Sequence, residues 1–143
     1  MPLISKRNLS KKLENKLFDL FFEALSELSN PSDVEKFLVS LLSPVEKTML
    51  AKRLGIAILL TKGYKYEEIK STLSVSQETI SKISLTLNYR GEGYKMVIEK
   101  MLKKEKVKDL LDNIVKATLS TFSYSSYTNK PADLPKTNLK SKF

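Results

Sequence analysis

Hydrophobic side chains recur at helical spacing along most of this chain, and the most informative pattern lies in residues 63–87. Ile69 and Leu73 are four residues apart, which places them on one face of a short helix. Ser76 follows in a short polar stretch and can cap a second helix. That helix has apolar residues at the spacing i, i+3 and i+7 from Ile80, the stripe of a packed helix. The pattern predicts two short helices joined by a tight turn.

The opposite face of the second helix carries small hydrogen-bonding groups and charges, namely Gln77, Glu78, Ser81 and Lys82. A short helix with such a face fits the major groove of DNA, where side-chain donors and acceptors read the edges of the bases. The two helices therefore predict a helix-turn-helix. On pattern alone, an ordinary helical hairpin with a solvated polar face is an equally good interpretation.

A helix is predicted from Ser10, as its cap, to about Leu28. Its apolar residues form a stripe that covers about 200° of the helix circumference. One packing surface rarely needs so wide a stripe. We expect two contact surfaces, one to the core of the same subunit and one to a second subunit. A central helix within one subunit is the alternative.

Two further helices are predicted before the hairpin. Asn30-Pro31 starts one that runs to about Leu42, with asparagine as the cap and proline at the first helical position. Ser43-Pro44-Val45-Glu46 is a capping box and starts a helix that ends near Thr61, just before Gly63. The second half of this helix is apolar almost all round, so we expect it to be the central buried helix.

Residues 88–94 contain several helix breakers and are expected to form a turn. A helix from about Tyr94, an interruption near Lys103-Lys104 and an amphipathic helix up to residue 122 follow. From Ser123 the composition changes to Ser, Thr, Asn, Pro and Lys, which is typical of disorder. The predicted organisation is a flexible N-terminus over 1–9, a helix-turn-helix domain over 10–104, an additional amphipathic helix over 105–122 and a disordered basic tail over 123–143.

The chain of 143 residues contains neither histidine nor cysteine. It therefore lacks the commonest catalytic and metal-binding side chains, and it has no glycine-rich phosphate loop. We expect neither an enzyme nor a bound metal or cofactor. No apolar run approaches the 18 or so residues of a membrane helix, and no signal peptide is recognisable. We expect a cytoplasmic protein without a membrane partner.

The formal net charge of +9 suits a polyanionic partner, but the charge is unevenly distributed. Residues 64–95 carry five basic and four acidic side chains, whereas residues 96–143 carry ten and five. The charge thus supports contact with nucleic acid without indicating the second helix of the hairpin. A non-specific nucleic-acid binder that uses the lysine-rich C-terminal third is one alternative. A helical interaction protein that keeps the fold without base readout is another.

A set of short motifs spans somewhat over half of the chain, between residues 21 and 101. They are the segments 37–38, 41–42, 50–54, 60–63, 66–69, 76–82 and 87–95. Thr79-Ile80-Ser81 and Leu87-Asn88-Tyr89 are the most specific of them. In these motifs the chain resembles the Trp repressor superfamily, and most closely the TrpR-related YerC/YecD family.

This resemblance implies an all-α, Trp-repressor-like domain that forms an intertwined homodimer and regulates transcription, as a repressor, by binding double-stranded DNA. Two recognition helices would then lie about one DNA turn apart, roughly 34 Å, over a pseudo-palindromic site. Carried over by position, the resemblance implies base contacts by Ser76, Gln77, Glu78 and Ser81, a base-edge or phosphate contact by Lys82, and a contact to the DNA backbone by Lys70.

The chain also departs from the family pattern. Lys82 replaces the arginine that usually follows Thr-Ile-Ser, and lysine lacks the planar fork of arginine. Ser43 and Arg53 remain as candidate contacts for an anion or effector, but the second arginine of the family's tryptophan site is missing. These departures argue against tryptophan, and we assign no effector. Lys65 stands where the family often has a serine or threonine cap, so the first helix of the hairpin is expected to start less firmly.

Overall fold

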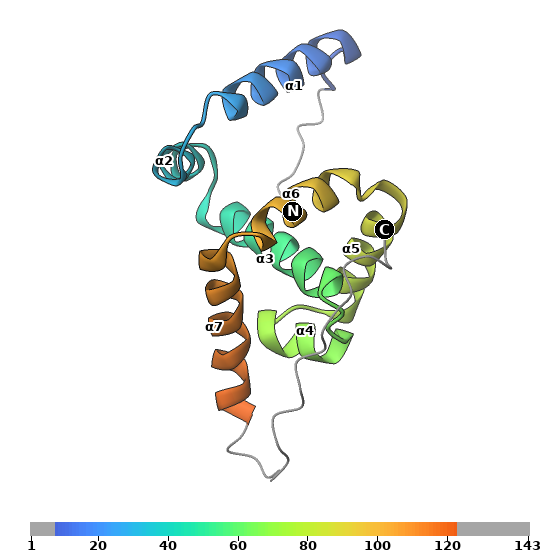
Figure 1. Ribbon diagram of the computed structural model, residues 1–143. Helices are drawn as coiled ribbons and strands as arrows, with labels where there is room; N and C mark the ends of the chain where they lie inside the picture. Colours follow the sequence, from blue (N-terminus) through green and yellow to red (C-terminus); the bar gives the residue numbers. More distant parts are fainter. Residues whose placement is uncertain (1–7, 123–143) are drawn as a thin grey trace. The chain divides into compact units, whose positions relative to one another are not determined.

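The computed structural model describes residues 8–122, and all the regular structure in this range is helical, as predicted (Figure 1). The described residues fall into two compact units, divided between Lys47 and Thr48. The tail predicted over 123–143 and most of the N-terminus predicted over 1–9 lie outside this range. The helices are α1 (Lys11–Ser26), α2 (Pro31–Leu41), α3 (Pro44–Thr61), α4 (Tyr66–Leu73), α5 (Gln77–Arg90), α6 (Glu92–Leu102) and α7 (Glu105–Phe122).

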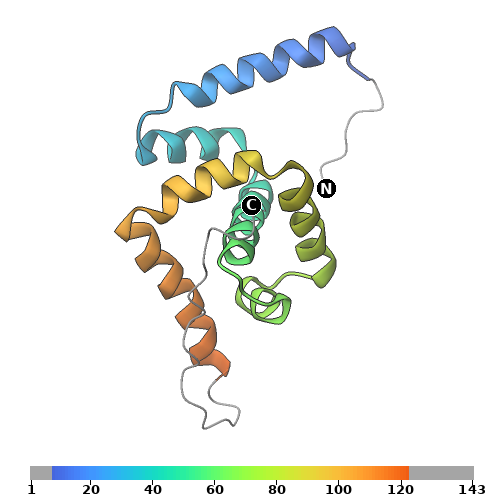
Figure 2. The ribbon, with the colours of Figure 1, turned by 45° about the vertical axis from the view of Figure 1, so that its right-hand side comes forward.

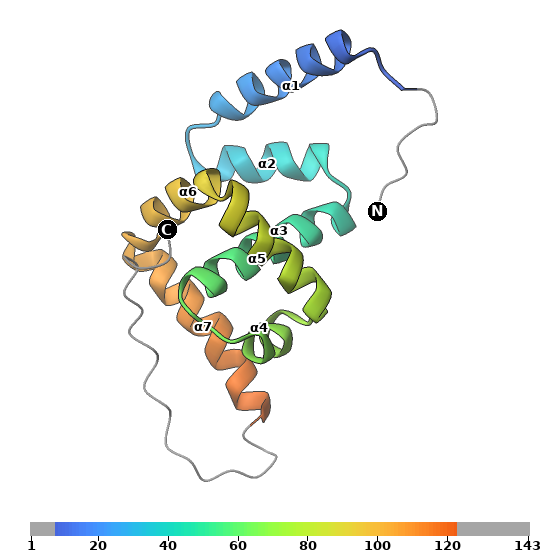
Figure 3. The same ribbon diagram turned by 90° about the vertical axis from the view of Figure 1, so that its right-hand side faces the viewer.

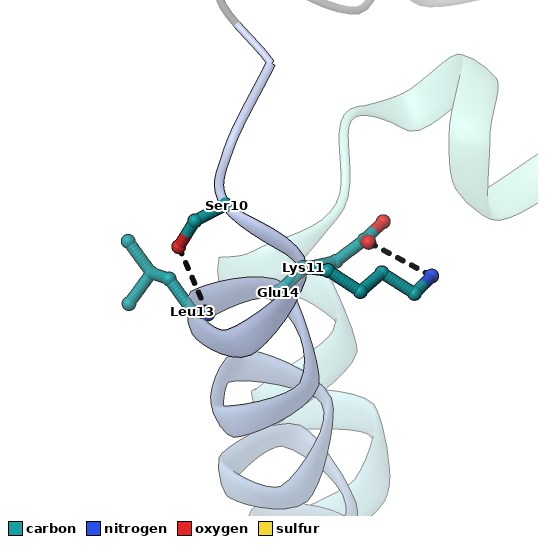
Figure 4. A network of polar contacts seen from close by, with 4 residues as sticks. All are labelled: Ser10, Lys11, Leu13 and Glu14. Atoms are coloured by element: carbon teal, nitrogen blue, oxygen red, sulfur yellow. Dashed lines mark hydrogen bonds and ion pairs between the residues drawn. The ribbon is translucent and has the colours of Figure 1, made fainter.

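The first unit begins with α1, which Ser10 caps as predicted (Figure 4). The Oγ of Ser10 accepts a hydrogen bond from the backbone N–H of Leu13 at 3.3 Å, and Lys11 and Glu14 form an ion pair at 3.2 Å. The helix ends at Ser26, two residues before the predicted end. The last turn tightens there, because the N–H of Leu28 bonds to a carbonyl only three residues back.

Two further caps in the first unit are also as predicted. Asn30 Oδ1 accepts from the N–H of Asp33 at 3.0 Å. Ser43 and Glu46 form a complete capping box: Ser43 Oγ accepts from the N–H of Glu46 at 3.2 Å, and a carboxylate oxygen of Glu46 accepts from the N–H of Ser43 at 2.8 Å. Hydrogen bonds to the carboxylate from the backbone N–H of Ser43, and then from its hydroxyl group, lower the pKa of the Glu46 carboxyl group.

Within the first unit, the apolar stripe of α1 is not covered. Neither α1 nor α2 has a buried residue, and Leu20 and Phe22 of α1 are 67% and 60% exposed. Within the first unit, α1 is therefore not the central buried helix that the alternative expects. The expected contact of the stripe with the core of the same subunit and with a second subunit stays a prediction.

The second unit is built around the second half of α3, as predicted. Figure 2 shows this half of α3 surrounded by α4, α5, α6 and α7. All four surrounding helices contribute buried side chains to one core. Its members are Ile56, Ala57, Ile58 and Leu59 of α3, Ile69 of α4, Ile80 and Ile83 of α5, Ile98 of α6, and Leu111 and Val115 of α7.

The end of α3 has the predicted glycine. Gly63 has a φ of 86°, in the left-handed region that glycine adopts without strain. The N–H of Tyr64 turns back to the carbonyl of Leu59 at 3.0 Å, and the N–H of Gly63 bonds to the carbonyl of Leu60 at 3.0 Å. These bonds satisfy carbonyls that the helix end would otherwise leave free.

The turn predicted over residues 88–94 is wrong, because the interruption between α5 and α6 is confined to Gly91. Gly91 is buried, and a Cβ built on it would overlap the carbonyl oxygen of Leu87. Gly93 lies inside α6, and a Cβ there would meet no atom within 4 Å. Gly91 therefore permits the backbone at the junction with α6 to pass close to the last turn of α5.

The interruption predicted near Lys103-Lys104 is confirmed, since α6 ends at Leu102 and α7 begins at Glu105. Figures 1 and 3 show α7 running from the end of α6 alongside α4, and both helices contact it. Near the loop before α4, burial and the negative charges of Asp112 on α7 and Glu68 on α4 raise the pKa of Tyr64. The additional helix thus shares its core with the hairpin.

Within residues 8–122, the helices are too short or too polar to cross a lipid bilayer.

Replacing Gly91 with alanine is expected to lower the free energy of unfolding by at least ~1 kcal/mol, because the new Cβ meets backbone and forces α5 and α6 apart. Gly93→Ala is the matched control. It adds the same methyl group at an open helical position and is expected to raise stability by up to ~1 kcal/mol. Urea unfolding followed by circular dichroism, at one fixed protein concentration, measures both. Equal effects of the two substitutions would contradict the proposed role of Gly91.

Candidate nucleic-acid interface

Helices α4 and α5 form the two-helix hairpin predicted from the sequence, joined by residues 74–76 (Figure 3). The two helices contact each other, and Ile69 of α4 and Ile80 of α5 are completely buried. Ile83 follows one turn later on the same buried face of α5. This apolar side fixes the α4–α5 hairpin to α3 and leaves its polar side outward.

The start of α4 has only half of a capping box. Glu68 accepts a hydrogen bond from the backbone N–H of Lys65 at 2.7 Å. The ammonium group of Lys65 can donate hydrogen bonds but cannot accept one, so the Lys65 side chain does not cap the helix in return. The expected weaker start of α4 has this structural basis.

The turn between α4 and α5 contains a strained residue and a long-range contact. Ser74 has a φ of 49° and a ψ of 60°, the left-handed conformation that usually favours glycine. The Nζ of Lys52, on α3, donates a hydrogen bond to the carbonyl oxygen of Ser74 at 3.1 Å. The structure thus places the ammonium group of Lys52 on the turn between α4 and α5. No sequence pattern predicts this contact, because the two partners lie 22 positions apart.

Helix α5 starts at the predicted cap. Ser76 Oγ accepts from the backbone N–H of Thr79 at 3.2 Å, and the hydroxyl groups of these two residues lie 2.9 Å apart. Ser76 is exposed, as a base contact would require, but its side chain already orders the first turn. Its contact with DNA stays a prediction.

Most of the residues that the resemblance implies for DNA contact are exposed on the hairpin. Gln77, Glu78 and Lys82 on α5 and Lys70 on α4 are exposed, whereas Ser81 is half-buried. Lys82 Nζ and Glu78 Oε1 form an ion pair at 2.8 Å. The hydrogen bond from Lys82, and then its charge, lower the pKa of the Glu78 carboxyl group.

The two candidate effector residues lie in different units of the chain. Ser43 belongs to the first unit and caps α3 with its side chain. Arg53 belongs to the second unit and is exposed on α3. Their contact with an anion or effector stays a prediction.

Residues 16–102, from within α1 to the end of α6, match the family model of the Trp repressor protein. The chain belongs to the Trp repressor family. It is also 30% identical over 94 residues to the uncharacterized protein YerC of Bacillus subtilis (strain 168), a match over 66% of this chain and 90% of that protein. This places the chain in the TrpR-related YerC/YecD family within the Trp repressor superfamily. No solved structure matches it significantly.

Membership of the Trp repressor family indicates a DNA-binding transcriptional regulator, since the members of this family are regulators rather than enzymes. The family match ends with α6, so α7 is an addition to the part of the chain that defines the family. In this chain the addition packs directly on α4, the first helix of the hairpin.

Ser74→Gly is expected to raise the free energy of unfolding by up to ~1 kcal/mol. The left-handed conformation costs an L residue ~1–2 kcal/mol, and the greater freedom of glycine in the unfolded chain offsets part of the gain. Ser71→Gly, at an exposed right-handed position of α4, is the control and is expected to lower stability by about 0.5 kcal/mol. Both are measured by urea unfolding. A loss of stability in Ser74→Gly would mean that Ser74 is not strained.

Proposed function

We propose that this protein is a sequence-specific regulator, acting as a repressor, that reads the major groove of double-stranded DNA through the α4–α5 hairpin. The observation that carries the proposal is the position of α5. Its apolar residues Ile80 and Ile83 are held in the core, while Gln77, Glu78 and Lys82 are exposed. A helix that is fixed on one side and polar on the other is what a recognition helix requires.

The exposed side chains have the chemistry to read bases. The amide of Gln77 can pair with adenine, the carboxylate of Glu78 can accept from cytosine, and the ammonium of Lys82 can donate to guanine. Lys70 on α4 is exposed and supplies a positive charge for the phosphate backbone. In this proposal Ser76 and Ser81 contribute short hydrogen-bonding groups beside these residues.

The protein is proposed to bind as a homodimer, and a second copy is the partner that covers the apolar stripe of α1. The exposed rings of Phe18 and Phe22 stack with their centroids 6.3 Å apart, and Leu20 is exposed beside them in sequence. Contiguous apolar surface of this kind marks an interaction site. The family resemblance implies an intertwined homodimer, and each copy offers the same stripe to the other.

A second candidate function is a helical interaction protein or non-specific nucleic-acid binder that keeps the fold without base readout. The observation in its favour is the charge of the hairpin. The charges of Glu78 and Lys82 cancel on the outward face of α5, and over half of the net positive charge of the chain lies in residues 96–143.

Selection of duplex DNA from a random pool at physiological salt is expected to enrich a pseudo-palindrome with half-sites roughly 34 Å apart. Gln77→Ala is expected to cost ~1–3 kcal/mol of binding free energy at that site, because a bidentate base contact is lost. Binding to a scrambled duplex should hardly change. Asn88→Ala, an exposed amide near the other end of α5, is the matched control and should leave both affinities unchanged.

The outcomes of this selection separate the candidate functions. Binding without enrichment, together with a steep dependence on salt, would favour a non-specific binder. No binding to any duplex would favour an interaction protein.

The homodimer is tested by Phe22→Glu, which places a charge in the apolar stripe of α1 and is expected to shift the protein from dimer to monomer. Sedimentation velocity over a range of concentrations measures the shift. Leu110→Glu introduces the same charge at a comparably exposed apolar position on α7, outside the family match, and should leave the dimer intact. A monomeric wild-type protein would contradict the proposal.

A further inference from the structure

The outward face of α5 contains an ion pair made of two residues that the proposed function assigns to DNA. Lys82 Nζ lies 2.8 Å from Glu78 Oε1, one helical turn away. The side chains remain 77% exposed for Glu78 and 71% exposed for Lys82. Both groups are therefore accessible to a ligand, but each already has the other as its partner.

The pair has an ordinary role in helix stability. Glu78 lies in the first turn of α5, where a negative charge is favourable, and a glutamate four residues before a lysine is the favourable order. This role predicts no effect on DNA beyond a small change in helix stability. It also does not explain why a carboxylate stands at the position that would meet a polyanion.

We infer that Glu78 is a specificity-determining residue that holds Lys82 away from phosphate and makes the pair select a C·G base pair. This inference rests on the proposed function, because it requires α5 to enter the major groove. The partner is duplex DNA whose half-site presents cytosine N4 and guanine O6 or N7 to the start of α5.

The selection follows from the bonds that each group can make in the groove. An exposed ion pair opens at little cost, because both partners are solvated. Inside the groove, the carboxylate loses water and must find a donor, and cytosine N4 is the base donor that suits it. Lys82 is then free to donate to guanine O6 or N7. At a site without a cytosine amino group, Glu78 remains bound to Lys82, meets acceptors, or meets an adenine amino group beside the N7 acceptor, and binding weakens.

The same pair limits attraction to DNA of any sequence. While Glu78 neutralises Lys82, the start of α5 contributes almost no net charge towards phosphate. Once the carboxylate is replaced by an amide, Lys82 can contact a phosphate. One more phosphate contact steepens the dependence of log K on log salt by about 0.9, which corresponds to about fivefold tighter binding in 0.15 M salt.

The test uses the full chain with Glu78→Gln, Lys82→Gln and both substitutions together, each checked for unchanged helicity. Binding is measured to the selected site, to a scrambled duplex and to duplexes with single base-pair changes. Glu78→Gln is expected to bind scrambled DNA about fivefold more tightly, with the steeper salt dependence. Its preference for C·G at one position of each half-site should fall about tenfold.

The double variant decides whether the effect runs through Lys82. With Lys82→Gln present, Glu78→Gln should no longer tighten binding to scrambled DNA, because the released ammonium group is gone. A gain of the same size in both backgrounds would overturn the inference, since it would show general electrostatic repulsion by Glu78. An unchanged base preference in Glu78→Gln would overturn it as well.

Glu67→Gln is the matched control. It removes a carboxylate that is also exposed and also lies in the first turn of a hairpin helix, α4. It should leave base preference and salt dependence unchanged, and a response equal to that of Glu78→Gln would overturn the inference. If the wild-type protein shows no site preference, both the inference and the proposed function fail. A preference that Gln77→Ala weakens and Glu78→Gln leaves unchanged would overturn the inference alone.

Discussion

The arrangement of the second unit depends on burying the second half of α3. Ile56 and Ala57 are completely inaccessible, and Ile58 and Leu59 nearly so. A helix with apolar residues on every side must be covered on every side. The four helices that follow it do so, and each contributes at least one buried aliphatic side chain to the same core. The orientation of the α4–α5 hairpin is a consequence of this packing.

Polar contacts add to the apolar core in fixing the conformation of the α4–α5 hairpin. Ser76 caps α5, and Glu68 forms one of the two hydrogen bonds of a capping box at α4. Lys52 of α3 donates a hydrogen bond to the carbonyl of Ser74. The last bond joins the central helix to the turn, the part of the hairpin with a left-handed residue. A displacement of α3 would therefore also move the turn between α4 and α5. The Glu78–Lys82 pair is exposed on α5, where solvent competes for both groups.

Helices α1 and α7 differ in how their apolar side chains are covered. At the N-terminal end, α1 leaves a wide stripe exposed, and the proposed second copy would cover it. Beyond the family match, α7 buries Leu111 and Val115 on the core that also holds the hairpin. The addition thus stabilises the fold from within the chain, whereas the stripe of α1 is the surface for the proposed second copy.

Local chemistry in the sequence determined most helix starts, because a cap bonds to a backbone group only three residues away. Ser10, Asn30, Ser43 and Ser76 all cap as their residue types predict. The apolar periodicity likewise identified α3 as the central helix. The family motifs identified the residues implied for DNA contact, and their role stays a prediction.

Tertiary structure determined the contacts that form only where helices approach one another. The bond from Lys52 to Ser74 joins residues 22 apart in the sequence and exists only when α3 packs beside the turn. Gly91 looked like the centre of a longer turn, yet it allows a buried, close passage from α5 to α6. The sequence predicted a wide apolar stripe on α1, but only the fold showed that the first unit leaves it exposed. Periodicity identifies the apolar face of a helix. Only the packing of the helices shows which of those side chains are buried within the same chain.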